Sequence, residues 1–231
     1  MSFNSVLIAN RGEIAIRLAR ALAEMDIHSV AVYAEDDAES LHVRRADTAI
    51  ALTGQGAAAY LDSEQLIAVA KAQGCDAIHP GYGFLSENAD FARRCLAAGI
   101  AFIGPAPEVL ETFGDKASAR RLALQQGIPL VQGTNEPTSL EQARAFMQSL
   151  GAGTAVMLKA LAGGGGRGMR AVHSLEELDE AFVRCSSEAK SAFGNDALYI
   201  ERLITRARHI EVQIIGDGTQ VSHLWERDCT L

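Results

Sequence analysis

The sequence predicts an α/β fold in which a parallel sheet covered by helices is followed by a smaller α+β region. Two observations support this prediction. Short apolar runs alternate with helix patterns through residues 5–104, and strand patterns, two of them flanking a run of glycines, dominate residues 154–226. The expected domains are residues 1–114, 115–203 and 204–231.

The first region repeats a strand–helix–strand pattern. Apolar runs such as SVLIA (5–9) fit the buried strands of a parallel sheet, and Asp62 is the expected N-cap of one helix. The turn ANRGE (9–13) holds one glycine where a dinucleotide-binding turn needs three, so we expect a Rossmann-like sheet without the cofactor site. The expected strands are 5–9, 29–33, 48–52, 76–80 and 101–104, and the expected helices are 12–25, 62–73 and 87–98.

The second region has an antiparallel α+β pattern. A helix over 114–126 is expected to have Asp115 as its cap, and a second helix begins near 138. A capping box formed by Ser174 and Glu177 opens a helix that continues to about Phe193. The expected strands are 154–161, 169–173, 198–203, 208–215 and 220–226, with a hairpin turn at 216–218.

A glycine-rich stretch, KALAGGGGRGMR (159–170), formally fits the dinucleotide fingerprint G-x-G-x-x-G through Gly163, Gly165 and Gly168. That fingerprint must open a helix, because the pyrophosphate sits on the helix N-terminus, whereas here the glycines precede a strand pattern. Glycines between two strands predict a hairpin whose backbone N–H groups close over a phosphate chain. The alternative is a mobile hairpin tip that binds no ligand.

Two lysines are candidate phosphate ligands. Lys159 lies between the apolar alternation partners Met157 and Leu161, and a lysine that faces the interior needs a fixed anion. Lys116 lies in the first turn of a predicted helix, where a cation opposes the helix dipole unless it binds a phosphate. The alternative for each is a lysine whose ammonium group lies in solvent.

Two further polar positions have both a site and a surface interpretation. Glu201 ends a predicted strand near a crossover, where a carboxylate and neighbouring backbone can bind the hydroxyls or base of a nucleotide. His209, Glu211 and Gln213 share one face of another strand, and that face either lines a site or meets solvent.

Composition argues against several classes of protein. The formal net charge of -8 is unsuited to a chain that lives on nucleic acid or an anionic membrane, although it permits a local basic pocket. No apolar run approaches the length of a membrane span, and we expect the chain in the cytoplasm. The cysteines show neither metal-ligand spacing nor a disulfide framework.

A series of motifs runs through the chain: IANRGEIAIR (8–17), AIHPGYGFLSEN (77–88), FIGP (102–105), GDKASAR (114–120), KALAGGGGRGMR (159–170), EAKSAFG (188–194), YIER (199–202), RHIEVQI (208–214) and ERDC (226–229). With these motifs the sequence closely resembles the biotin carboxylase component of biotin-dependent carboxylases, in the ATP-grasp superfamily. The resemblance implies a Rossmann-like N-terminal domain, an ATP-grasp lid domain with the glycine loop, and the start of the ATP-grasp C-lobe.

The resemblance also implies an activity and partners. In this family ATP, with Mg²⁺ or Mn²⁺, drives bicarbonate to carboxyphosphate, and the carboxyl group then passes to biotin on a biotin carboxyl carrier domain. A carboxyltransferase completes the reaction. The family is often a homodimer through its N-terminal helix region, where Arg20 and Glu24 occupy matching positions. The final acyl acceptor does not follow from these residues.

Matching positions also suggest site residues. Gly165 and Gly166 would lie over the phosphates, and Tyr82 and Gly83 near the biotin pocket. The other expected ATP contacts are Lys116 and Lys159 on the phosphate and adenine side, the base-binding hinge Glu201, Arg202, Leu203 and Ile204, and the nucleotide contact His209. No catalytic residue and no metal ligand is expected within these positions.

In one respect the sequence departs from the family pattern. There, ERDC is followed by a Gln-Arg-Arg segment and later by residues that hold magnesium, bicarbonate and biotin, whereas this chain ends at Leu231. Phosphoryl transfer needs those charges, so we expect the chain alone not to turn over. The alternatives are a carbamoyl phosphate synthetase-like ligase and a non-catalytic nucleotide-binding or dimerisation module, while the glycine context disfavours an NAD oxidoreductase.

Overall fold

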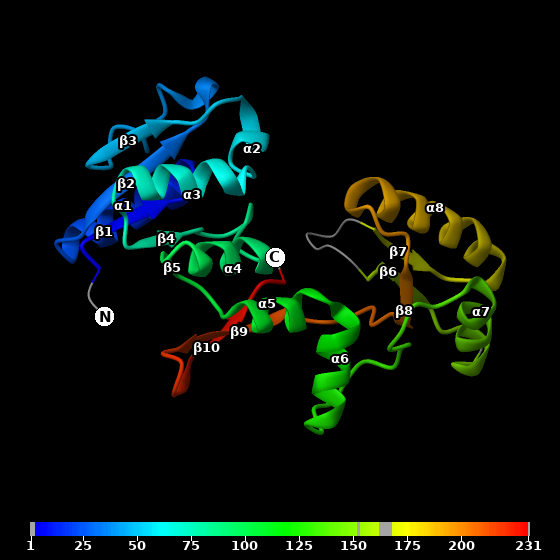
Figure 1. Ribbon diagram of the computed structural model, residues 1–231. Coiled ribbons are helices and arrows are strands. Elements are labelled where there is room, and N and C mark those ends of the chain that lie inside the picture. Colours follow the sequence, from blue (N-terminus) through cyan, green and yellow to red (C-terminus); the bar gives the residue numbers. More distant parts are fainter. Residues whose placement is uncertain (1–2, 152, 162–167, 231) are drawn as a thin grey trace. The chain divides into compact units, whose positions relative to one another are not determined.

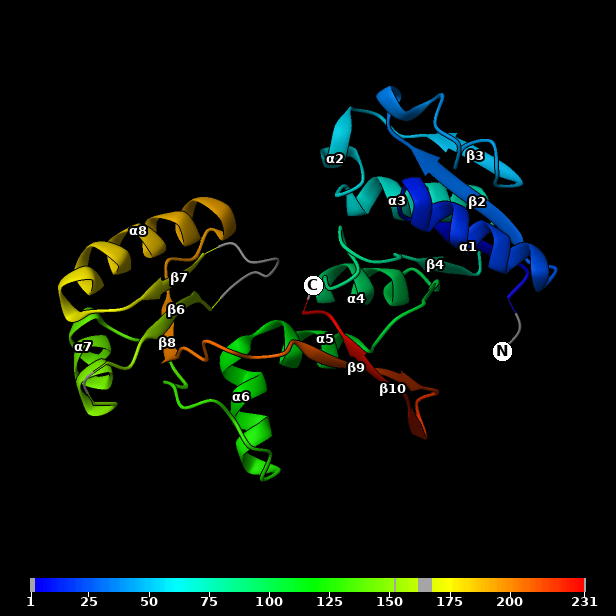
Figure 2. The same cartoon turned by 180° about the vertical axis from the view of Figure 1, so that it is seen from behind.

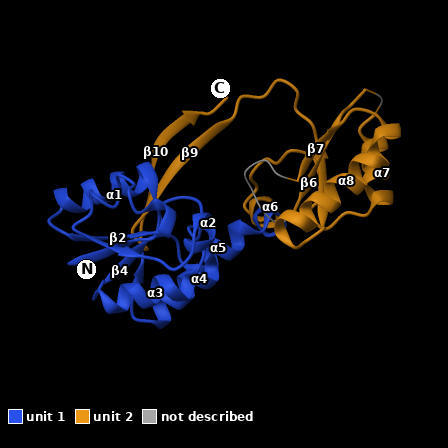
Figure 3. Cartoon of the chain, turned by 90° about the horizontal axis from the view of Figure 1, so that it is seen from above, with its two compact units in different colours: residues 1–119 blue, residues 120–231 orange. Residues whose placement is uncertain are grey.

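The computed structural model of the chain describes all residues except 1–2, 152, 162–167 and 231 (Figure 1). The chain divides into two compact units, residues 1–119 and residues 120–231 (Figure 3). Each unit has its own hydrophobic core. No helix of the described residues combines the length and the apolar character that crossing a membrane requires.

Unit 1 contains a five-stranded parallel sheet with the strand order β3-β2-β1-β4-β5. The predicted parallel sheet is therefore confirmed, although β5 is only two residues long. The strands are β1 (Ser5–Ile8), β2 (His28–Tyr33), β3 (Thr48–Ala51), β4 (Ala77–His79) and β5 (Ala101–Phe102).

Helices cover both faces of this sheet (Figure 2). Val6 and Ile8 of β1 are fully buried in a cluster that includes residues of α1, whereas Leu7 between them is buried against Leu66 and Phe91 on the other face. Full burial of each such side chain contributes about 1.5–3 kcal/mol. The helices of unit 1 are α1 (Gly12–Glu24), the 3-10 helix η1 (Glu35–Asp37), α2 (Gly56–Ala59), α3 (Ser63–Ala72), α4 (Ala89–Ala97) and α5 (Pro107–Gly114).

The helix ends test the predicted caps. Asp62 accepts the N–H of Gln65 at 3.0 Å and caps α3, as predicted. The helix α6 (Lys116–Gln125) continues from unit 1 into unit 2, and its expected cap is also confirmed, because the Asp115 carboxylate accepts the N–H of Ser118 at 2.9 Å. The sequence pattern did not predict α5, which ends just before Asp115 and which Pro107 begins.

Unit 2 contains an antiparallel sheet with the strand order β7-β6-β8 and a separate β9-β10 hairpin. The glycine stretch therefore joins two paired strands, as predicted. The strands are β6 (Val156–Ala160), β7 (Met169–Val172), β8 (Leu198–Arg202), β9 (Ile210–Gly216) and β10 (Val221–Asp228), and the further helices are α7 (Leu140–Ser149) and α8 (Leu175–Phe193).

Helices α7 and α8 cover one face of the three-stranded sheet (Figure 1). Leu158 of β6 and Ile200 of β8 are fully buried there with Leu178 and Cys185 of α8. Residues 132–134 pair with the edge of β8. The N–H of Arg202 donates to the carbonyl of Gln132 at 2.8 Å, and the N–H of Thr134 donates to the carbonyl of Ile200 at 2.9 Å. The side chains of β6 and β8 that point away from α7 and α8 lie on the opposite face of the sheet.

The capping box predicted for α8 is wrong. The hydroxyl of Ser174 makes no capping hydrogen bond, because it interacts with the carboxylate of Glu176. Glu177 accepts the N–H of His173 at 3.0 Å, one residue earlier than a capping box requires. A complete capping box opens α7 instead, at Ser139.

Candidate functional site

The face of the three-stranded sheet opposite α7 and α8 carries polar and aromatic side chains. Because alternate residues of a strand point to opposite faces, Met157 and Lys159 of β6 lie on this face. Tyr199 and Glu201 of β8 lie beside them, since the strand register pairs Met157 with Glu201 and Lys159 with Tyr199. Two of the predicted nucleotide residues, Lys159 and Glu201, are therefore neighbours.

Lys159 and Glu201 form an ion pair on this face. Their side chains are only 24% and 13% exposed, so both charges are largely withdrawn from water. The sequence predicted that Lys159 needs a fixed anion, and the chain itself supplies one in this carboxylate. Removing Glu201 would leave the charge of Lys159 without its partner in a site of limited hydration.

A second cation, Arg120 of α6, approaches the other oxygen of the same carboxylate. Its Nη1 lies 3.7 Å from Glu201 Oε2, while Nε donates to Asn135 Oδ1 at 3.1 Å and Nη2 to the carbonyl of Val131 at 2.9 Å. The guanidinium carbon lies 5.8 Å from the centroid of the Tyr199 ring. Two cations sharing one carboxylate carry a net positive charge, which favours an anionic ligand.

The buried aromatic ring of Tyr199 packs beneath the Arg120 guanidinium, on the same sheet face as Lys159 and Glu201. Burial, and after it the negative charge of Glu201, raise the pKa of Tyr199 to about 12. The phenol therefore keeps its proton at physiological pH, and the ring can support the Arg120 guanidinium without adding a negative charge of its own.

A hollow of about 630 Å³ lies where β8 ends. Arg202, Leu203 and Ile204 line it together with the facing segment 130–132, so three of the predicted hinge residues meet at one cavity. The backbone of this hinge is fixed, because the Leu203 N–H donates to the carbonyl of Ala155 at 2.9 Å.

Gly133 allows the segment beside the hinge to approach β8 closely. A Cβ at Gly133 would lie 2.7 Å from the carbonyl oxygen of Ile200 and 2.9 Å from the Cβ of Glu201. Any larger residue would push the segment away from the carboxylate. The position of Glu201 therefore depends on a glycine outside the glycine-rich stretch.

The other predicted nucleotide residues lie elsewhere or are not described. Gly165 and Gly166 lie outside the described residues. Lys116 is the first residue of α6 and belongs to unit 1. His209 is exposed and precedes β9, where its carbonyl accepts the N–H of Cys229 at 2.7 Å. The nucleotide contacts assigned to these four residues remain predictions.

Tyr82 and Gly83 lie in the turn after β4. The chain connections from β1 and β4 run toward opposite edges of the sheet, and ligands of α/β proteins bind at such a switch point. The Tyr82 hydroxyl donates to the carboxylate of Glu13 in α1, and this hydrogen bond raises the pKa of the Tyr82 phenol. The two residues predicted near a biotin pocket thus lie where a ligand could reach them.

In the turn 9–13, which holds a single glycine, the charge of Arg11 is neutralised by a carboxylate of the same chain. Arg11, which precedes α1, pairs with Asp37 at 2.9 Å, and the Tyr60 hydroxyl donates to the same carboxylate at 2.7 Å. A carboxylate thus holds the cation that a pyrophosphate would need. The absence of a dinucleotide site from this turn stays a prediction.

Metal ligands and thiols are the remaining groups that could carry chemistry. Among the described residues, no group of three or more His, Cys, Asp or Glu side chains could hold a metal ion. Burial raises the thiol pKa of both Cys95 and Cys185 to about 11, which disfavours thiolate chemistry.

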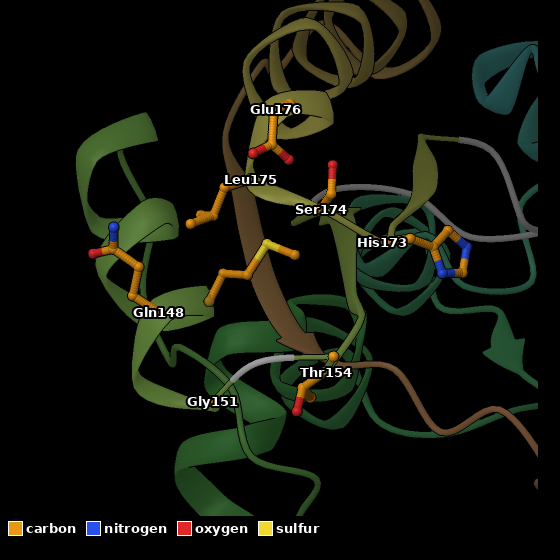
Figure 4. Close-up of a pocket in the computed structure, with 9 residues that line it drawn as sticks. Gln148, Gly151, Thr154, His173, Ser174, Leu175 and Glu176 are labelled. Carbon is orange, nitrogen blue, oxygen red and sulfur yellow. The ribbon is translucent and has the colours of Figure 1, made fainter.

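A second hollow in unit 2, of about 380 Å³, lies between the end of α7 and the start of α8 (Figure 4). Gln148, Thr154 and Ser174 contribute polar groups to its lining. No lysine or arginine is among its described lining residues, and Glu176 adds a negative charge. This hollow is therefore less suited to a phosphate than the face that carries Lys159.

Two residues that organise these sites were not predicted from the sequence. Arg120 is the last residue of the GDKASAR motif, and Asn10, which binds the turn after β4, belongs to IANRGEIAIR. The motifs were the only signal for either residue, because the partners of both side chains lie far away in the sequence.

Comparisons with known proteins agree with this geometry. Residues 2–110 match the family described as biotin carboxylase, N-terminal domain, and residues 115–231 match the family described as carbamoyl-phosphate synthase L chain, ATP binding domain. Mitochondrial pyruvate carboxylase of Rattus norvegicus is 53% identical over 231 residues, which cover 98% of this chain and 19% of the relative.

Solved structures give the same result. The biotin carboxylase–β-γ-ATP complex of Campylobacter jejuni has a TM-score of 0.95 at 42% identity, covering 99% of this chain and 51% of that one. The biotin carboxylase domain dimer of Hydrogenobacter thermophilus 2-oxoglutarate carboxylase, solved with MgADP, ADP and bicarbonate, has a TM-score of 0.95 at 43% identity with the same coverage.

The charged sheet face and the match over residues 115–231 define an ATP-grasp protein. More particularly, the chain belongs to the biotin carboxylase family and matches its N-terminal part. It spans 19% of the rat pyruvate carboxylase and 51% of the C. jejuni biotin carboxylase. The predicted family and fold class are confirmed.

Proposed function

We propose that this chain is the N-terminal part of an ATP-dependent biotin carboxylase, which activates bicarbonate as carboxyphosphate and carboxylates biotin. The observation that carries this proposal is the cluster of Lys159, Glu201 and Arg120 on the sheet face opposite α7 and α8, beside the hinge hollow. ATP supplies the phosphoryl group for the activation, and the residues of this face bind and orient it.

In this proposal the adenine base lies against the hinge Glu201–Ile204 and the phosphates lie toward Lys159. Before ATP binds, Lys159 is neutralised by Glu201. When Lys159 turns to the nucleotide, Arg120 remains as the cation closest to the carboxylate, with Nη1 at 3.7 Å. The ion pair therefore holds Lys159 in place without leaving Glu201 unpaired when ATP arrives.

Calorimetry with ATP tests the binding step. The 231-residue chain should bind ATP, and the Lys159→Met variant should bind it more weakly, because a charge-assisted contact to the nucleotide is lost. Binding without turnover would also agree with a nucleotide-binding module, so turnover must be measured separately. If neither the chain nor the longer protein that contains it binds ATP, the proposed function is wrong.

We further propose that the 231 residues by themselves do not turn over ATP. The described residues offer no metal-ligand cluster, and the chain covers 51% of the C. jejuni biotin carboxylase. The measurement is phosphate release with bicarbonate and free biotin, compared between this chain and the longer protein. Turnover by the 231 residues at the rate of the longer protein would overturn this proposal.

A second candidate function is that of a carbamoyl phosphate synthetase-like ligase, which also activates bicarbonate. The match of residues 115–231 to an ATP-binding domain of that name is the observation in its favour. The two functions differ in the acceptor of the activated carboxyl group. Dependence of product formation on biotin supports the carboxylase, and dependence on an ammonia donor supports the synthetase.

The proposed partners are a biotin carboxyl carrier domain, a carboxyltransferase and a second copy of the chain, with Arg20 and Glu24 at the dimer contact. The similar domain of H. thermophilus 2-oxoglutarate carboxylase is a dimer, which supports the last of these. The relatives differ in their final acceptor, pyruvate in one and 2-oxoglutarate in another, so the acceptor must be assayed. A cytoplasmic location also remains a prediction.

A further inference from the structure

One buried side chain, that of Asn10, holds the turn after β4. Asn10 follows β1 and is only 3% exposed. Its Nδ2 donates to the carbonyl of Pro80 at 2.7 Å and to the carbonyl of Tyr82 at 2.8 Å, while its Oδ1 accepts the N–H of Arg11 at 2.8 Å. Both amide protons and the amide oxygen are used, so the side chain has a single favourable orientation.

Two further groups fix the same turn. Gly81 has a φ of +66°, and a Cβ there would lie 2.7 Å from Asn10 Nδ2. The Gly81 N–H donates to Nδ1 of His79 at 3.0 Å, which requires that nitrogen to carry no proton. Burial lowers the pKa of His79 and so favours the neutral ring that this hydrogen bond needs. Asn10 and His79 therefore hold the turn together.

These contacts determine where Tyr82 lies. Asn10 binds its carbonyl, and Glu13 accepts a hydrogen bond from its hydroxyl. The residue nevertheless remains 62% exposed. A side chain that is anchored at its backbone and its hydroxyl, and open to solvent at the switch point of the sheet, is suited to contacting a ligand.

We propose that Asn10 is a positioning residue for the biotin acceptor: it shapes the turn 80–83 so that Tyr82 meets the ligand. This inference rests on the proposed function and on the prediction from the sequence that Tyr82 and Gly83 lie near the biotin pocket. Without the Asn10 amide, the carbonyls of Pro80 and Tyr82 lose their donor and the turn relaxes. Biotin binding weakens, whereas the handling of ATP does not depend on these contacts.

The test is steady-state kinetics of the longer protein that contains this chain, with free biotin as the varied substrate. Asn10→Ala should raise KM for biotin by about 10- to 100-fold while changing KM for ATP by less than about twofold. Asn10→Asp keeps the shape but turns a carboxylate toward two carbonyl oxygens, so its effect on KM for biotin should be at least as large.

Asp62→Ala is the matched control. It removes the N-cap of α3 in the same unit and so destabilises the fold without touching the turn. KM for biotin should stay at the wild-type value in this variant. If Asp62→Ala raises it as much as Asn10→Ala does, the effect is one of general stability and the positioning role is wrong.

Two more variants separate the possible failures. If Tyr82→Ala leaves KM for biotin unchanged, the proposed biotin site is wrong; if Tyr82→Ala raises it and Asn10→Ala does not, only the positioning role is wrong. Gly81→Ala displaces the Asn10 amide without removing it, so this variant replaces the Asn10 variants in the test if they do not fold. An unchanged KM for biotin in folded Gly81→Ala would also overturn the inference.

Discussion

The parallel sheet of unit 1 and the three-stranded sheet of unit 2 offer ligands different surfaces. Helices cover both faces of the parallel sheet in unit 1, so the sheet meets ligands at its edges, and Asn10 and the turn after β4 lie at the carboxyl edge. The antiparallel sheet in unit 2 is covered on one face and carries Lys159 and Glu201 on the other. The coverage of each sheet thus indicates where its ligand can bind.

The two surfaces also differ in charge. At the edge of the parallel sheet the cation Arg11 is matched by Asp37. The turn after β4 is held by the neutral side chains of Asn10 and His79, and the Tyr82 hydroxyl donates to the Glu13 carboxylate. On the antiparallel sheet two cations share the single carboxylate of Glu201. The first arrangement suits a neutral ligand such as the biotin ureido group, and the second suits a phosphate.

The largest expected effect comes from the two separate cores. Leu158→Ala in unit 2 and Leu7→Ala in unit 1 should each cost about 2–5 kcal/mol, because both side chains are fully buried. Hydrogen exchange should show faster amides in β6 and β8 for the first variant and in β1 and β4 for the second. Equal acceleration in both units by either variant would show that the units unfold together.

The next effect concerns the charged face. Lys159→Met should weaken ATP binding by about 10- to 100-fold, since a contact to a charged group contributes about 1.5–3 kcal/mol. Lys190→Met is the control, because Lys190 pairs with Asp196 at 3.7 Å on an exposed surface of the same unit. Titration calorimetry should separate the two variants. Equal affinities would remove Lys159 from the proposed site.

A smaller effect is expected for Arg120→Lys. Lysine keeps the charge near Glu201 but cannot reach Asn135 and Val131 together, so unit 2 should lose about 1–2 kcal/mol in urea denaturation. Arg184→Lys, in an exposed pair with Glu180, should change stability by less than about 0.5 kcal/mol. A larger loss for Arg184→Lys would contradict the anchoring role of Arg120.

The smallest effect is a pH dependence in unit 1. Burial favours protonation of Asp37, but hydrogen bonds from Arg11 and Tyr60 outweigh it and hold the Asp37 pKa below its ordinary value. The ionised Asp37 carboxylate therefore stabilises the folded state. Its contribution to the free energy of unfolding is present above the unfolded-state pKa and is lost as the pH falls through the lower folded-state pKa. Asp37→Asn should reduce the loss of unfolding free energy at acid pH, measured by denaturation curves at several pH values, by no more than about 1 kcal/mol. If the variant loses as much stability at acid pH as the wild type, Asp37 does not contribute to the pH dependence of stability.

Much of the fold could be predicted because its signals are local. The continuous apolar runs such as SVLIA predicted the parallel sheet, and the strand patterns on either side of the glycines predicted the antiparallel one. The helix α5 was missed although Pro107 stands at its start, and the capping box at Ser174 failed because a neighbouring carboxylate engaged the hydroxyl. Short-range competition of this kind is not visible in a residue pattern.

The sites were predictable only in part. Lys159 and Glu201 were named separately, but their ion pair follows from the register of β6 and β8, which the sequence does not specify. Arg120 and Asn10 act through partners that only the fold brings near. Gly81 and Gly133, which allow close backbone approach, were not singled out from the sequence, because the neighbours that a Cβ would meet belong to distant segments.

Hydrogen exchange of the protein with and without ATP tests the central claim most directly. If ATP binds the charged face of the antiparallel sheet, it should slow exchange in β6 and in the hinge 201–204, and should leave the turns at 9–13 and 80–83 unchanged. Protection confined to the carboxyl edge of the parallel sheet, with none in β6 or the hinge, would contradict the account.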